Sequence, residues 1–205
     1  MIKLILKELK HHASFTAFGA FTGILIILFF HNLPEKTSYN IFYTLHPLHV
    51  FFSALVTGSM YRLHKSGGSG VKCNIWALIA IGYVGSVGIA TLSDSIIPYL
   101  GEVMLDMPNR GIHFGFIEEW WLVSPLALAG IAIAYFRPRT KFPHAGHVLL
   151  STWASLFHIM MAMGKRLDGV FYIGVFFFLF IAVWIPCCIS DIIFPLLFVK
   201  NAKNA

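Results

Sequence analysis

The sequence predicts an all-α integral membrane protein with six transmembrane helices, arranged as two inverted repeats of three helices each. Three observations predict it: an apolar composition, six long apolar stretches, and two motifs that recur in the same order. Apolar residues make up 58% of the 205 residues and charged residues only 12%, with a mean hydropathy of +0.76. This composition leaves too little polar surface to cover a water-soluble protein, so we expect the chain to lie in a lipid bilayer.

Six apolar stretches cover most of the chain, and each is near or above the roughly 20 residues that a transmembrane helix needs. Their lengths, with Gly and Ala inside them, favour helices over buried strands. Only short loops remain, so we expect residues 1–205 to form a single membrane domain without a soluble appendage. The expected spans are 14–30, 42–61, 75–100, 114–136, 147–163 and 170–199.

The first span follows three lysines, Lys3, Lys7 and Lys10, and so resembles the start of a secretory signal peptide. No small-residue cleavage site is evident after the apolar run. We therefore interpret 14–30 as a retained first helix.

Orientation follows from the Lys and Arg residues in the loops, which are enriched on the cytoplasmic side of membrane proteins. Six spans place eleven of them on one side: Lys3, Lys7, Lys10, Arg62, Lys65, Lys72, Arg137, Arg139, Lys141, Lys200 and Lys203. The other side carries four: Lys36, Arg110, Lys165 and Arg166. We expect both termini to be cytoplasmic, in a plasma or inner membrane. The net charge of +6 then indicates orientation and contact with anionic lipids, and no nucleic-acid partner.

Two motifs recur in the two halves of the chain. Residues 46–53 (HPLHVFFS) match 144–151 (HAGHVLLS) at an offset of 98, and 93–100 (SDSIIPYL) match 190–197 (SDIIFPLL) at an offset of 97. We interpret 1–100 and 101–205 as two three-helix repeats. Since a unit of three spans reverses direction when it is copied, the halves should have inverted topology, as in many secondary transporters.

The repeated motifs carry the candidate ligands. In each HxxH motif a spacing of three places both imidazoles on one helix face, and Ser53 and Ser151 continue the two stripes. We expect two clusters near opposite membrane faces. The outer one contains His46, His49, Asp94, His158 and one of Glu118 and Glu119; the inner one contains His144, His147, Asp191 and one of His11 and His12.

The chemistry of these residues favours metal binding. An Asp near the centre of a span costs about 2.5–3.5 kcal/mol, so an ionisable residue there is a functional hypothesis by default. Two imidazoles with one or two carboxylates suit Zn, Fe(II), Mn, Co or Ni, whereas calcium and magnesium prefer oxygen ligands. Asp94 and Asp191 could instead have a structural role, in which they cap short turns before Pro98 and Pro195. Histidines near helix ends are interpreted as interfacial anchors: His31, His64 and His113.

Three functions stay open. The first, which we favour, is a divalent transition-metal transporter. The second is a two-haem b-type cytochrome, with haem iron held by axial pairs such as His49 with His158 and His12 with His147. The third is a membrane metalloenzyme acting on a lipid, for which the sequence identifies no catalytic residue. The cysteines predict no disulfide framework, and adjacent Cys187 and Cys188 are interpreted as packed small residues. A homo-oligomer is compatible with all three.

Overall fold

A computed structural model describes residues 2–66, 73–164 and 168–199, which form helices and short connections, with no strand among these residues. The polypeptide runs through three long continuous helices, two long helices interrupted by π-helical turns, and two shorter segments. In chain order the elements are α1 (Ile2–Phe30), α2 (Glu35–Ser66), α3 (Ile75–Tyr83), η1 (Val84–Gly88), α4 (Ile89–Thr91), η2 (Leu92–Ile96), α5 (Ile97–Met104), α6 (Gly115–Glu118), α7 (Trp120–Phe136), α8 (Lys141–Ala162), α9 (Gly169–Cys188), η3 (Ile189–Ile193) and α10 (Phe194–Leu197).

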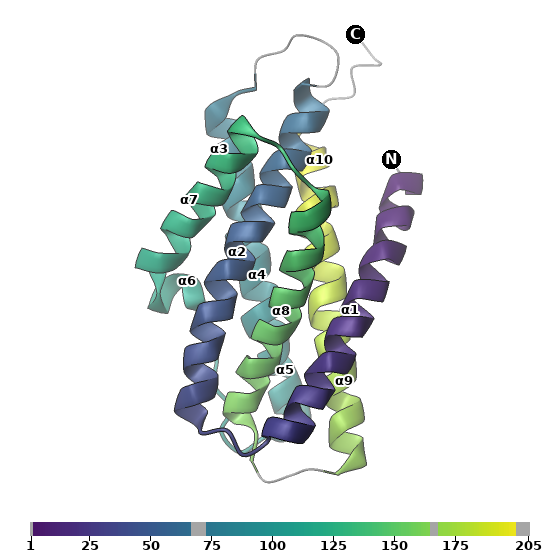
Figure 1. Cartoon of the computed structure of the whole chain (residues 1–205), viewed down its shortest axis with the longest axis vertical. Helices are drawn as coiled ribbons and strands as arrows, with labels where there is room; N and C mark the ends of the chain where they lie inside the picture. The colour runs from purple at the N-terminus through teal and green to yellow at the C-terminus, as the bar shows by residue number, and fades with distance from the viewer. Residues whose placement is uncertain (1, 67–72, 165–167, 200–205) are drawn as a thin grey trace.

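The helices form a bundle in which α2 and α8 lie side by side in the middle (Figure 1). Helix α1 packs against α8 and α9, and α7 packs against α2 and α3. The first helix of each half of the chain therefore packs against the other half. The start of α1 and the end of α10 lie at the same end of the bundle (Figure 1).

The distribution of side chains is the reverse of that in a water-soluble protein. Large apolar residues point outward, among them Phe29, Trp76 and Phe136, which are 77%, 76% and 76% exposed. Several histidine, serine, threonine and aspartate side chains are instead buried between the helices, among them His46, Thr57, Ser93 and Asp94. This pattern is compatible with a bundle whose outer face contacts lipid tails and whose polar groups find partners inside it.

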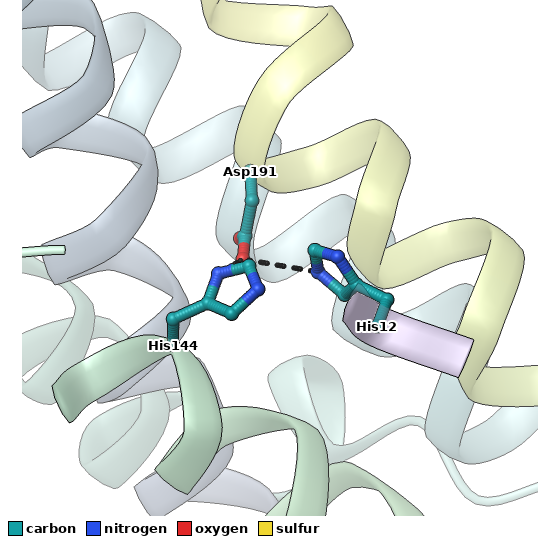
Figure 2. A group of neighbouring side chains, drawn as sticks. All are labelled: His12, His144 and Asp191. Carbon is teal, nitrogen blue, oxygen red and sulfur yellow. Dashed lines mark ion pairs between the residues drawn. The ribbon is translucent and has the colours of Figure 1, made fainter. Parts of the chain in front are cut away.

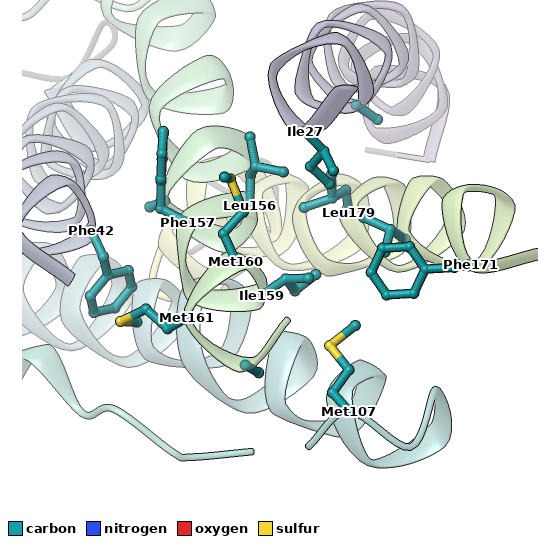
Figure 3. Close-up of a cluster of buried hydrophobic side chains, with 14 of the residues drawn as sticks. Ile27, Phe42, Met107, Leu156, Phe157, Ile159, Met160, Met161, Phe171 and Leu179 are labelled. Atoms are coloured by element: carbon teal, nitrogen blue, oxygen red, sulfur yellow. The ribbon is translucent and has the colours of Figure 1, made fainter. Parts of the chain in front are cut away.

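One end of the bundle is filled by an apolar core. Ile27 of α1, Leu156 of α8 and Leu179 of α9 meet there, and Phe171 and Met107 close it near the connecting loops (Figure 3). This core fixes the mutual position of α1, α8 and α9. It thereby positions the polar residues that occupy the middle of the same helices.

Five helices among the described residues are long and apolar enough to cross a bilayer: His12–Phe30, Glu35–Lys65, Ile75–Met104, His144–Ala162 and Gly169–Leu197. The expected span 114–136 is instead divided at Glu119 (φ −124°, ψ 39°), between α6 and α7. Helix α7 has 17 residues, about 25 Å, which falls short of a hydrocarbon core of about 30 Å. The adjacent carboxylates of Glu118 and Glu119 account for the break, because acidic residues are costly inside an apolar helix.

Both Ser-Asp motifs lie in π-helical turns, η2 and η3. Pro98 and Pro195 each stand four residues after the aspartate, at positions 94 and 191. A proline has no N–H for the carbonyl four residues before it, and its ring crowds that carbonyl. The wider π-helical turn accommodates this without ending the helix, so the expected short turns before the prolines are not observed.

Candidate metal centre

The first cluster joins the HxxH motif of α2 to the aspartate of η2. Nδ1 of His46 and Nδ1 of His49 donate to the same oxygen, Oδ2 of Asp94, at 2.9 Å and 2.7 Å. The three residues, which we call the first triad, are at most 1% exposed. As predicted, the spacing of three places both imidazoles on one face of α2, where they meet one carboxylate.

The other oxygen of Asp94 is also occupied. Oδ1 accepts hydrogen bonds from the hydroxyls of Ser93, at 2.7 Å, and Ser151, at 2.8 Å. A buried carboxylate needs such partners, because burying an unpaired charge is costly. Four donors from three helices thus hold Asp94 in place.

The second cluster has the corresponding composition. Oδ2 of Asp191 lies 3.1 Å from Nδ1 of His144, 3.0 Å from Nε2 of His147 and 3.8 Å from Nε2 of His12. Figure 2 shows the rings of His12 and His144 approaching Asp191 from α1 and α8. In each cluster three candidate ligand atoms lie within 4.8 Å of one another. We call His12, His144 and Asp191 the second triad, with His147 beside it.

The two triads lie next to each other. The rings of His49 and His147 are stacked, with centroids 5.8 Å apart and an interplanar angle of 13°. Sγ of Cys187 lies 4.0 Å from Nε2 of His49. The expected separation of the clusters to opposite membrane faces is therefore wrong: the crossing of α2 and α8 brings the two HxxH motifs together in the interior.

Hydroxyl groups connect each half of the chain to the aspartate turn of the other. On α2, the hydroxyls of Ser53 and Thr57 lie 3.2 Å and 3.1 Å from that of Ser190. On α8, Ser151 bonds Ser93 and Asp94, and Ser155 donates to the carbonyl of Ser93 at 2.9 Å. In both helices the hydroxyls that make these contacts lie seven and eleven positions after the first histidine of the HxxH motif. They belong to Ser53 and Thr57 on α2 and to Ser151 and Ser155 on α8.

Three predicted ligands lie elsewhere. His158 pairs with Glu102, with Nδ1 2.7 Å from Oε1, and does not join the first triad. The carboxylate of Glu118 accepts from the Phe114 backbone and lies 3.7 Å from His113. Glu119 is half-buried at the break before α7, outside both triads. The side chain of His11 lies outside the described residues.

Two residues near the triads were missed by the sequence analysis. Cys187 precedes Asp191 by four residues, so helical spacing placed it near the face of that aspartate, and this signal was available. Glu102 follows Asp94 by eight residues, across the end of the π-helical turn η2. Glu102 was passed over because no repeated motif contains it, and Cys187 because buried cysteines are common.

The chain matches no protein family, no curated protein sequence and no solved structure in the comparisons. The chemistry of the triads is therefore inferred from the side chains themselves. Buried His and Asp groups of this kind can hold a metal ion, since each triad offers two imidazoles and one carboxylate.

Proposed function

We propose that this protein binds divalent transition metals at the two triads and moves the ions between them across the membrane. The observation that carries the proposal is the closeness of two similar buried triads, where His49 of the first triad stacks on His147, which lies beside the second. Adjacent sites of similar composition allow an ion to be passed on without crossing an apolar layer. The candidate ions are Zn, Fe(II), Mn, Co and Ni.

The proposal includes six membrane crossings and an inverted repeat. Its support is the correspondence of interactions between the halves: each HxxH motif meets the aspartate of its own half, and each following serine meets the turn of the other half. Inverted repeats around a site inside the bilayer permit alternating access by rocking one half against the other. In this arrangement α7, though short, is the counterpart of α1.

The ligand chemistry also favours a mobile ion. Each triad contributes one carboxylate, so an ion with two positive charges is only partly neutralised there. Incomplete neutralisation limits affinity, as release to the next site requires.

Metal stoichiometry tests the binding step. Asp94→Asn and Asp191→Asn should each lower by one the number of ions bound per chain, because each substitution removes the only carboxylate of a triad. Elemental analysis of protein purified without chelators measures the number. Asp106→Asn is the matched control, since this carboxylate is 84% exposed. Unchanged stoichiometry in the double variant Asp94→Asn, Asp191→Asn would contradict the assignment.

Orientation is tested by cysteine labelling in a Cys73→Ser background. Burial raises the pKa of the native Cys73 thiol, which slows its reaction, and Cys187 and Cys188 are buried. With both termini cytoplasmic, Asp106→Cys should react with an impermeant maleimide on intact cells. Arg139→Cys lies just after the C-terminal end of α7, on the other side of that crossing from Asp106, and should react only after permeabilisation. Labelling of both positions from the same side would refute six crossings.

The two alternatives have less support. The two-haem cytochrome has less support because its candidate axial ligands make other contacts. His158 is paired with Glu102, and the rings of His12 and His147 converge on the Asp191 carboxylate. A visible spectrum without a haem band is the expected result. For the enzyme reading, the triad side chains are at most 15% exposed, which favours passage of a small ion over access of a lipid.

A further inference from the structure

A third group of ionisable side chains lies outside the triads, where α5, α6, α8 and the connection 105–114 meet. It contains Glu102 of α5 and His158 of α8, both fully buried, and His113 and Glu118, both partly exposed. Neither the repeated motifs nor the proposed transport between triads accounts for it.

The pair at its centre has the geometry of a supported metal ligand. Glu102 Oε1 lies 2.7 Å from Nδ1 of His158, and Oε2 accepts from the backbone N–H of Gly111 at 3.2 Å. The carboxylate is therefore fixed and in turn fixes the imidazole ring. Metal-binding histidines commonly have such a carboxylate on the nitrogen that does not bind the ion, which raises the basicity of the other nitrogen.

The other nitrogen of His158 is the reason to infer a ligand. Its Nε2 atom is buried and has no hydrogen-bond partner among the described residues. A buried polar atom without a partner is costly unless something binds it. The ring of His113 lies close by, with centroids 5.4 Å apart, and Nδ1 of His113 is 3.7 Å from Oε2 of Glu118.

We propose that His158 and His113 bind a divalent transition metal at a third site, that Glu102 positions His158, and that the carboxylate of Glu118 lies beside His113. Metal–nitrogen bonds of about 2.0–2.1 Å allow two rings at this separation to reach one ion. His113 is 28% exposed and Glu118 35% exposed, so the ion has a route from the surface to the buried imidazole. Two imidazole donors suit the same transition-metal ions as the triads.

The site lies next to the first triad and is separated from it by one ring. Phe42 stacks on His46, with centroids 5.4 Å apart and planes at 19°, and meets His158 edge-on at 5.4 Å. Figure 3 shows Phe42 on α2 beside Met161 of α8. If ions pass to the first triad from this site, the Phe42 ring must move aside. This role in transport rests on the proposed function, whereas binding at the third site does not.

The repeat does not produce a second pair of this kind. At the offsets of 98 and 97, His158 corresponds to Met60 and Glu102 to Val199. Neither can repeat the imidazole–carboxylate pair. The third site therefore has no counterpart elsewhere in the repeat.

The test uses Co²⁺ as the probe on the full chain carrying Asp94→Asn and Asp191→Asn, measured by equilibrium dialysis and visible ligand-field absorption. One Co²⁺ should still bind. His158→Gln should abolish that binding, and Glu102→Gln should weaken it about 10- to 100-fold, as loss of an outer carboxylate typically does. His31→Gln is the matched control and should change nothing, because Nδ1 of His31 contacts the Leu28 carbonyl at 3.3 Å and the ring is in neither triad nor the third site.

No Co²⁺ binding in the double aspartate variant, or full binding after His158→Gln, would overturn the third site. His113→Gln, at a partly exposed position, tests the same ligand set should His158→Gln fail to fold. The two proposals fail differently. If the triads bind no metal, wild type and the double aspartate variant bind one Co²⁺ alike; if the third site is wrong, wild type binds at the triads and His158→Gln changes nothing.

Discussion

His144→Ala is expected to reduce protein-dependent Zn²⁺ or Co²⁺ flux into proteoliposomes to that of protein-free vesicles, while the first triad keeps its ion. His144 lies 3.1 Å from Asp191 and, at 15% exposed, is the most accessible residue of either triad. It therefore stands where an ion would leave or enter the second triad. Transport needs both triads, whereas binding at the first triad needs only His46, His49 and Asp94.

The measurement pairs an indicator sealed inside the vesicles with metal analysis of the same protein in detergent. His144→Gln retains a polar side chain of similar length and separates loss of the ligand from loss of packing against His12, whose ring centroid lies 4.0 Å away. His64→Ala is the control, because His64 contacts the Met60 carbonyl of its own helix and belongs to neither triad. Wild-type protein that binds metal at both triads and yet shows no flux of any candidate ion would exclude transport.

Helical spacing accounts for the part of the site that the sequence predicted. Each HxxH motif lies on one helix turn, so spacing alone predicts that His46 and His49 share a face, and the repeated Ser-Asp motif identifies Asp94 as a candidate partner. That Asp94 lies beside both imidazoles depends on how the helices pack. The all-helical fold and its apolar outer face followed from composition.

The remaining contacts depend on how helices cross, which spacing within one helix does not determine. Position on one face of α8 predicted that His158 lies with Asp94. In the structure His158 instead pairs with Glu102 of α5. The π-helical turns η1 and η2 precede Glu102 and have more residues per turn than an α-helix. A count of 3.6 residues per turn therefore assigns the residues after them to the wrong face of the helix. The contact of His49 with His147 depends on the crossing of α2 and α8.

Gly130→Leu is expected to cause the largest loss of stability of any single substitution considered for the bundle. A side chain at this position of α7 would overlap the backbone carbonyl oxygen of Phe51 on α2 and approach Ala54 and the Leu55 backbone, both at 3.1 Å. A backbone cannot rotate away as a side chain can, so α7 must separate from α2. Overpacking typically costs about 1–3 kcal/mol, and the displaced backbone places this variant at the upper end or beyond.

Thermal unfolding in detergent, followed by circular dichroism, measures the loss, and Gly130→Ala should show a smaller decrease. Gly146→Ala is the matched control, because a methyl group there meets no atom within 4 Å, and alanine is favoured over glycine in a helix by about 0.5–1 kcal/mol. Gly130→Leu should also weaken Co²⁺ binding at the first triad, since a displaced α7 pulls on the adjoining α6, where Gly115 lies against the His46 ring. A Gly130→Leu variant as stable as Gly146→Ala would show that α7 does not pack closely on α2.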